Sequence, residues 1–160
     1  MRRLYSPWRY PYVASHKSGR NCIFCKALSL SSDEEGLMLY RGKQSFIILN
    51  AFPYNNGHLM IAPNSHTSSF EDTDTELTTE LIQLMQKCIK ILSLVYKPDG
   101  FNIGLNLGKV AGAGIADHYH WHIVPRWNGD TSFMTVVGET RVIPEDPHST
   151  FKKLKPHFKD

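Results

Sequence analysis

The chain has 160 residues, of which 41% are hydrophobic and 21% are charged, a composition typical of one soluble globular domain with its own core. The formal net charge is only +3 at pH 7 and no long block of Lys or Arg occurs, which argues against a nucleic-acid-binding protein. No apolar run approaches the roughly 20 residues that a membrane-spanning helix needs. The amino terminus lacks the apolar core of a signal peptide, so we expect a cytoplasmic protein.

The first half of the chain is predicted to begin with an aromatic-rich extended arm, residues 1–20. A short helix and three strands follow, at residues 22–30, 37–40, 45–50 and 58–62. The first two strands are joined by a hairpin turn, and Asn55-Asn56-Gly57 marks a loop before the third. These strands are close enough in sequence to pair antiparallel.

A long helix is predicted next. Thr73 and Glu76 have the spacing of a capping box at its start, and 97–100 ends it. Apolar residues recur every three or four positions and form one face: Leu77, Leu81, Leu84, Cys88, Leu92 and Val95. This face is suited either to the domain's own sheet or to a second copy of the chain.

Two further strands are predicted, at 101–107 and at the histidine-rich segment that begins at His118, separated by a glycine-containing loop. The order of strands, helix and strands predicts an α+β domain, with a mostly antiparallel five-stranded sheet and one long helix on one face. We expect a single domain with a core at 22–126. Residues 127–160 form a tail whose pattern is weak.

The segment His118-Tyr119-His120-Trp121-His122 is the strongest indication of function. Alternate residues of a strand share one face, so the three histidines would stand in a row about 7 Å apart. Histidine binds metals as the neutral ring and is a competent nucleophile toward phosphorus. The alternative is an exposed strand face that is rich in histidine but has no function.

This segment resembles the signature of the histidine triad (HIT) superfamily. Asn50, Gly57-His58, Pro63 and His66, the long helix and the glycine loop follow in the expected order, so the resemblance covers about residues 22–126. Residues 126–134 further resemble the branch of dinucleoside-polyphosphate phosphorylases. The resemblance implies a HIT-like fold, a nucleotide substrate such as a diadenosine polyphosphate, and a homodimer or larger homo-oligomer.

The resemblance also implies the catalytic roles. His120 would attack the α-phosphorus and form a covalent nucleotidyl-histidine, which water or phosphate then resolves, and His122 would contact phosphate oxygens and assist the leaving group. His122 stands where the uridylyltransferase branch has glutamine, which favours hydrolysis or phosphorolysis over exchange between sugar phosphates. An imidazole suits both halves of such a reaction, because it is nucleophilic when neutral and leaves readily once phosphorylated.

Several residues are expected to bind the nucleotide. Asn50 would bind the ribose hydroxyls, since a carboxamide both donates and accepts, and Asn106 would contact a phosphate. Backbone N–H groups that approach the phosphates are expected from the loop residues Gly112, Ala113, Gly114 and Ile115. These features also have purely structural interpretations. Asn50 can be a polar residue that ends a strand, and the glycine loop can be an ordinary turn.

A zinc site is the second chemical prediction. Cys22 and Cys25, together with His66 and one triad histidine, would form a tetrahedral Cys₂His₂ site, and the resemblance implies that the triad ligand is His118. Four protein ligands leave no open position, so such a zinc ion would be structural. The alternative is a reduced, metal-free pair of cysteines in a small core.

Two other functions stay open at this point. In a metal-dependent hydrolase, the three triad histidines would bind one catalytic ion, although three alternate strand residues span about 13 Å. In a nucleotide-binding or sensing protein, the same pocket would hold a ligand with little turnover.

Overall fold

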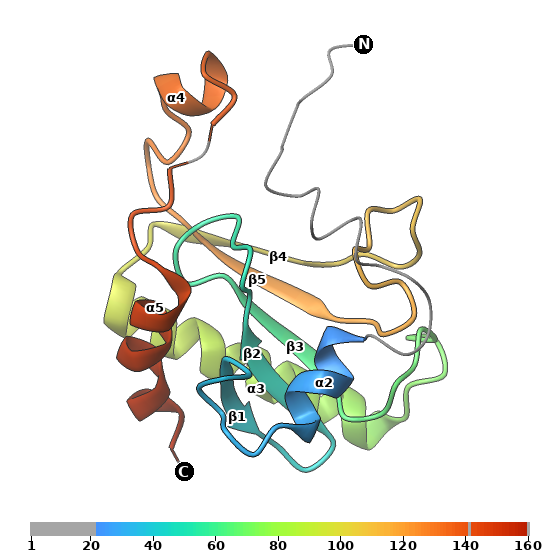
Figure 1. The fold of residues 1–160 in the computed structure, drawn as a ribbon. Helices are drawn as coiled ribbons and strands as arrows, with labels where there is room; N and C mark the ends of the chain where they lie inside the picture. Colours follow the sequence, from blue (N-terminus) through green and yellow to red (C-terminus); the bar gives the residue numbers. More distant parts are fainter. Residues whose placement is uncertain (1–21, 141, 160) are drawn as a thin grey trace.

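The computed structural model describes residues 22–140 and 142–159, so the extended arm predicted for residues 1–20 lies outside the described residues. A five-stranded sheet of order β1-β2-β3-β5-β4 forms the centre of the molecule, and all of its neighbouring strands are antiparallel (Figure 1). The strands are β1 (Met38–Arg41), β2 (Ser45–Leu49), β3 (Leu59–Pro63), β4 (Gly100–Leu105) and β5 (Trp121–Arg126). The predicted α+β fold is confirmed.

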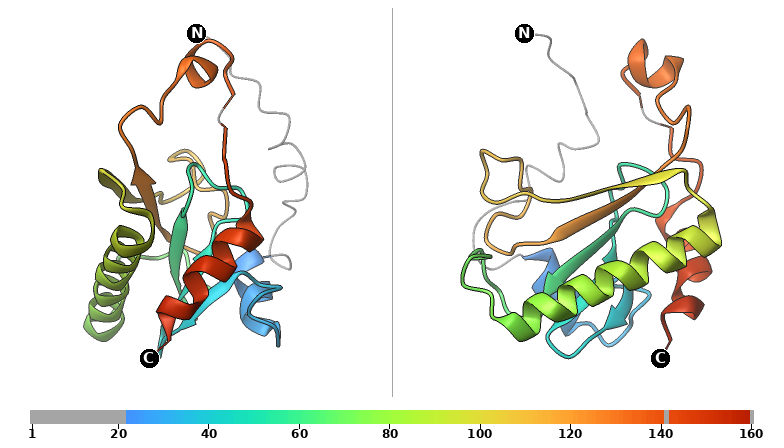
Figure 2. Two further views of the ribbon diagram at one scale, coloured as in Figure 1. Left: turned by 90° about the vertical axis from the view of Figure 1, so that its left-hand side faces the viewer. Right: turned by 180° about the vertical axis from the view of Figure 1, so that it is seen from behind.

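Helix α3 (Thr75–Tyr96) runs across one face of the sheet (Figure 2). The predicted N-cap at Thr73 is wrong: Asp74 caps the helix, and its carboxylate accepts the N–H of Leu77 at 2.8 Å. The Thr73 hydroxyl instead forms a hydrogen bond of 2.9 Å with the Tyr119 hydroxyl. A carboxylate at this position also interacts favourably with the helix dipole. Among the described residues, no helix is long and apolar enough to cross a membrane.

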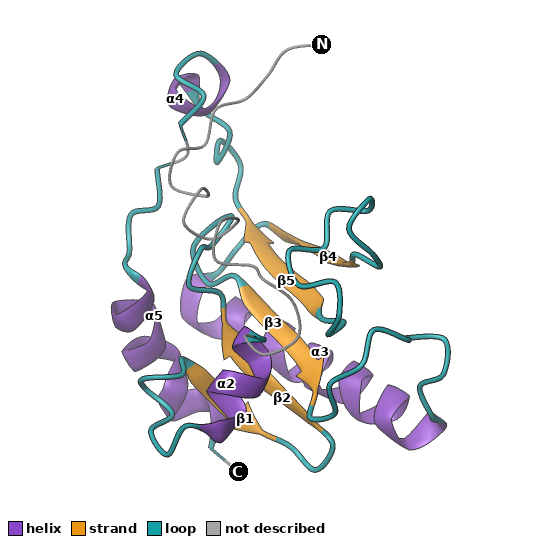
Figure 3. Cartoon of the chain, turned by 45° about the vertical axis from the view of Figure 1, so that its right-hand side comes forward, coloured by secondary structure: helices purple, strands orange, loops and turns teal. Residues whose placement is uncertain are grey.

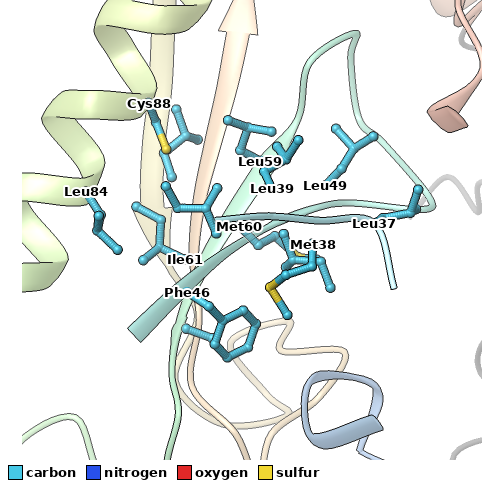
Figure 4. Close-up of a cluster of buried hydrophobic side chains, with 14 of the residues drawn as sticks. Leu37, Met38, Leu39, Phe46, Leu49, Leu59, Met60, Ile61, Leu84 and Cys88 are labelled. Atoms are coloured by element: carbon cyan, nitrogen blue, oxygen red, sulfur yellow. The ribbon is translucent and has the colours of Figure 1, made fainter. Parts of the chain in front are cut away.

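The hydrophobic core is built around β2 and β3, and it takes side chains from α3 and β1 and also from α2 (Ile23–Ser29), α5 (Pro147–Leu154) and η2 (Lys155–Phe158). Every residue of β2 and of β3 is buried, because helices or loops cover both faces of these strands. Figure 4 shows Leu84 and Cys88 of α3 pointing toward strand residues such as Ile61. The periodic apolar face of α3 is therefore used within this domain, which answers one alternative that the sequence left open.

On the other side, the short helix α2 (Ile23–Ser29) lies near the ends of the strands, and its Phe24 is fully buried. The predicted short N-terminal helix is thus confirmed. Its N-cap is Cys22, which places the first cysteine before the helix and the second within its first turn.

The tail contains more structure than its sequence pattern suggested. It forms the short helix α4 (Phe133–Val136), then α5 (Pro147–Leu154) and the 3-10 helix η2 (Lys155–Phe158). Asp146 caps α5 and Pro147 occupies its first turn, where a missing N–H costs nothing. The Lys155 ammonium donates to Asp33 at 2.7 Å and to the carbonyls of Met38 and Leu39, which attaches the tail to β1. Helix α4 projects away from the sheet (Figure 3).

Candidate active site and metal centre

The three triad histidines do not all lie on a strand as predicted. Strand β5 begins at Trp121, so His118 and His120 belong to the segment before it. The ladder between β3 and β5 ends at Ile61 and Trp121, and farther along β3 the carbonyl of Pro63 accepts the ring Nε2–H of His118 at 2.8 Å. The alternation of faces nevertheless holds, because the His120 and His122 rings lie 4.8 Å apart, while Tyr119 packs against Phe70.

His120 has the geometry of a nucleophile. Its Nδ1–H donates to the carbonyl of His118 at 3.0 Å, so the lone pair of the neutral ring is on Nε2. The residue is only 4% exposed, and the ring of Phe24 packs against it at 4.7 Å between centroids. Burial lowers the pKa of His120, which keeps the ring neutral and therefore nucleophilic at neutral pH.

His122 is held by His58, a residue that the sequence analysis did not place in the site. Nδ1 of His58 accepts the backbone N–H of Tyr54 at 3.1 Å and lies 3.2 Å from the Asn50 amide nitrogen. The ring proton of His58 is therefore on Nε2, which donates to Nδ1 of His122 at 2.9 Å. It follows that His122 carries its own proton on Nε2 and can donate it to a phosphate oxygen.

Burial keeps this histidine pair neutral. Desolvation, followed by the charge of His122, lowers the pKa of His58 from 6.5 to about 3, and desolvation lowers that of His122 to about 4. The signal in the sequence was Gly57-His58: Gly57 adopts a φ of +70°, and a side chain there would approach Leu92 within 3.1 Å. The turn thus positions His58 beneath the triad.

This buried histidine makes stability depend on pH. The folded pKa of His58 lies below its unfolded value, so stability is present above pH 6.5 and is lost as the pH falls toward 3. Between about pH 6 and pH 4, His58 alone is expected to lower the free energy of unfolding by about 1.4 kcal/mol per pH unit. The free energy of unfolding, measured by urea denaturation between pH 6 and pH 4, should depend on pH less steeply in His58→Asn than in the wild type, by about 1.4 kcal/mol per pH unit. The exposed His148→Asn is the control, and equal slopes for wild type and His58→Asn would contradict the assignment.

Hydrogen bonds at both ends of the loop 50–57 hold it in place. The Asn50 side-chain oxygen accepts the N–H of Phe52 at 2.9 Å, so the residue predicted to bind ribose also shapes its own turn. At the other end, the Asn55 amide donates to Asp130 at 2.9 Å. Asp130 in turn accepts two hydrogen bonds from the Arg126 guanidinium, at 2.6 and 2.7 Å. This bidentate pair holds the loop against the end of β5.

The glycine loop is placed close to Asn106, as the proposed phosphate site requires. Gly112 has a φ of +96°, and a side chain there would point to the Asn106 amide at 4.0 Å. However, the N–H groups of Gly112 and Ala113 donate to the carbonyls of Lys109 and Gly108. The prediction that loop N–H groups bind phosphate therefore narrows to the two residues that follow, Gly114 and Ile115.

The four predicted metal ligands come together. Their donor atoms all lie within 4.8 Å of one another: Cys22, Cys25, His66 and His118. Three sulfur-to-Nδ1 distances are 3.3, 3.4 and 3.7 Å. A tetrahedral zinc ion with Zn–S of about 2.3 Å and Zn–N of about 2.1 Å requires such pairs to lie about 3.6 Å apart. The donor set and its spacing therefore fit zinc.

His118 connects this group to the candidate nucleophile. Its Nε2–H donates to Pro63, which leaves Nδ1 free of a proton and directed at the cysteines, as metal-bound histidines are usually held. Its backbone carbonyl accepts the proton of His120. The same residue thus belongs to the cysteine–histidine group and sets the tautomer of His120.

Comparison with known proteins agrees with this geometry. The HIT domain model matches residues 32–129. The chain is 44% identical to the AP-4-A phosphorylase of Mycobacterium tuberculosis over 91% of its own length and 78% of that protein. It is 30% identical to the adenosine 5′-monophosphoramidase of Saccharomyces cerevisiae over 66% of its own length and 62% of that protein.

A solved structure shares the fold. The zinc-bound histidine triad family protein of Mycobacterium smegmatis superimposes with a TM-score of 0.68 at 28% identity, over 86% of this chain and 93% of that one. The sequence match, the fold and the arrangement of the triad agree, and the resemblance stated from the sequence is confirmed. The chain belongs to the histidine triad (HIT) family.

Proposed function

We propose that the chain is an enzyme that cleaves a phosphoanhydride bond of a dinucleoside polyphosphate through a nucleotidyl-histidine on His120, with phosphate as the acceptor. The observation that carries the proposal is the hydrogen bond from Nδ1 of His120 to the His118 carbonyl, since it leaves the Nε2 lone pair for attack. The 44% identity to an AP-4-A phosphorylase supports the substrate class and the acceptor.

The reaction proceeds in two displacements. In the first, Nε2 of His120 forms a bond to the α-phosphorus while the bond from that phosphorus to the bridging oxygen breaks. The Nε2–H of His122 donates to the departing nucleotide, a direction that its hydrogen bond to His58 sets. In the second, an oxygen of inorganic phosphate attacks the same phosphorus and His120 leaves.

The binding groups are proposed from the same cleft. Asn50 binds the ribose hydroxyls with the hydrogen-bonding capacity that its turn does not use, and Asn106 contacts a phosphate. The N–H groups of Gly114 and Ile115 accompany them, since both residues lie in the loop just before the triad. Together with His122, these groups would neutralise charge that develops in the transition state.

We also propose that zinc occupies the cysteine–histidine group and that it is structural. Cys22, Cys25, His66 and His118 would supply all four ligands, so the ion would join α2 to the segment that carries the nucleophile. None of the three cysteines among the described residues forms a disulfide. Cysteines without disulfides support the prediction of a cytoplasmic protein.

The two other functions weighed from the sequence receive less support. For a single catalytic metal on the triad, His118, His120 and His122 would have to converge, yet Nδ1 of His118 faces the cysteines and Nδ1 of His122 faces His58. For a binding protein without turnover, a buried and neutral His120 with an oriented proton would have no purpose.

A homodimer is proposed from the free edge of the sheet. β4 is the last strand of the sheet, and its six residues contain neither Pro nor Lys, the residues that commonly protect an edge strand. Ile103 is exposed in the middle of this strand. A second copy of the same strand can pair with it across a two-fold axis and extend the sheet.

The proposed function is tested by product analysis with diadenosine tetraphosphate, with and without inorganic phosphate. We expect ADP and ATP, formed only when phosphate is present. AMP and ATP without phosphate would show that water is the acceptor and that the chain is a hydrolase. Absence of any product, with tight nucleotide binding retained, would favour the binding protein.

A further inference from the structure

The segment that carries α4 exposes an unusual number of apolar side chains. We call residues 131–140 the α4 arm. Phe133, Met134, Val136 and Val137 are 44% to 72% exposed. Scattered exposed apolar residues are ordinary, whereas a contiguous group marks a contact surface. Figures 1 and 3 show the α4 arm extending past the sheet, beyond β4 and near the end where that strand begins.

The backbone of β4 indicates how a second copy would approach. The Pro125 carbonyl accepts the Asn55 amide at 3.1 Å, on the β3 side of β5. Phe101, which pairs with Pro125, therefore directs its N–H and C=O away from β5. The direction of the backbone N–H and C=O groups alternates from one residue to the next. Those of Ile103 and Leu105 therefore point to the same free edge as those of Phe101. The outward-facing backbone groups of Phe101, Ile103 and Leu105 can pair with those of the same three residues in an antiparallel second copy. This pairing places the two-fold axis at Ile103.

This register brings the α4 arm to the partner's glycine loop. In antiparallel pairing, the beginning of one β4 lies beside the end of the other. The α4 arm stands near the beginning of its own strand, so it faces the end of the partner's strand and the loop that follows. There Leu107 and Val110 are exposed apolar residues. The same loop continues to Gly114 and Ile115, which belong to the candidate phosphate site.

We propose that the α4 arm of each copy packs on the partner subunit's Leu107 and Val110 and forms the outer wall of the partner's substrate cleft. The occupant of both apolar surfaces is a second copy of this chain. The contact would exclude water from the phosphate loop where the departing nucleotide leaves. The inference rests on the proposed homodimer and on the proposed reaction.

The experiment combines two defects in one dimer. One chain carries His120→Gly with an intact α4 arm, and the other carries Phe133→Ser and Val137→Ser with an intact His120. The chains are co-expressed with different tags and purified through both. If the arm acts on the partner, the one intact His120 is covered by an intact arm, and turnover of diadenosine tetraphosphate is expected to be roughly half that of the wild-type dimer.

Each remaining outcome decides a different point. The homodimer with both arm substitutions is expected to show a KM raised by about tenfold. Leu94→Ser, an exposed apolar residue of α3, is the matched control and should not change KM. A heterodimer no more active than that arm-variant homodimer would mean that each arm serves its own site, which overturns the inference. If the wild-type protein sediments as a monomer and is fully active, both the homodimer and the contact of the α4 arm with a partner are wrong. The nucleotidyl-histidine chemistry would be unaffected.

Discussion

Replacing His120 with glycine is expected to lower the turnover of diadenosine tetraphosphate by about 10⁴-fold or more. In the proposed reaction the imidazole of His120 becomes bonded to phosphorus, so its removal would eliminate both displacements rather than weaken one contact. The variant should still fold, although removing a buried ring that packs on Phe24 leaves a cavity and lowers stability. Intact-mass analysis of rapidly quenched wild-type enzyme should show a nucleotide adduct that His120→Gly lacks.

The control for this variant is His148→Gly, which removes an exposed histidine from the tail helix α5. It should retain wild-type turnover. Activity that persisted in His120→Gly would refute the nucleophile, and sensitivity of that activity to a chelator would then become the decisive measurement. A second informative variant is His58→Asn, since loss of its donor to His122 should lower kcat more than it raises KM.

Cys25→Ser is expected to reduce the zinc content from about one ion per chain to nearly none and to lower Tm by about 10 °C. Serine is not deprotonated at neutral pH and is a poor zinc ligand. Metal that binds only the folded chain contributes its binding free energy to stability, and a loss of about 3 kcal/mol corresponds to this change in Tm for a domain of this size. Elemental analysis and thermal unfolding measure the two effects.

Cys88→Ala is the matched thiol control. Cys88 is fully buried on α3 and lies outside the cysteine–histidine group, so its substitution should cost a few degrees through packing but leave the zinc content unchanged. A wild-type protein that holds no zinc after growth with added zinc would contradict the metal proposal. The nucleophile would be unaffected, since its hydrogen bond to the His118 carbonyl needs no metal.

Much of the fold, and the grouping of the candidate site residues, could be predicted from the sequence. Strands with strong β-branched and aromatic content, such as Ser45–Leu49, and the apolar repeat from Leu77 to Leu92 specify their elements through local periodicity. The alternation of histidines at 118, 120 and 122 is equally local, because the backbone period alone places their side chains on one side. The candidate metal ligands were predicted on other grounds: the spacing of Cys22 and Cys25 is typical of a zinc site, and the resemblance to the HIT superfamily implied His118 as the triad ligand.

Other features depended on the tertiary structure. The N-cap of α3 is Asp74 rather than Thr73, and the hydroxyl of Thr73 is instead bonded to Tyr119, far along the chain. The pairing of β5 with β3 ends at Trp121 and Ile61, so His118 and His120 lie before the strand. The end of the tail is joined to the rest of the domain by Lys155, whose ammonium donates to Asp33. His58 was placed in the site only by its contact with His122 across two strands. Side-chain periodicity is a property of neighbouring residues, whereas hydrogen-bond partners, tautomers and the lowered pKa values of buried histidines arise from residues that only folding brings together.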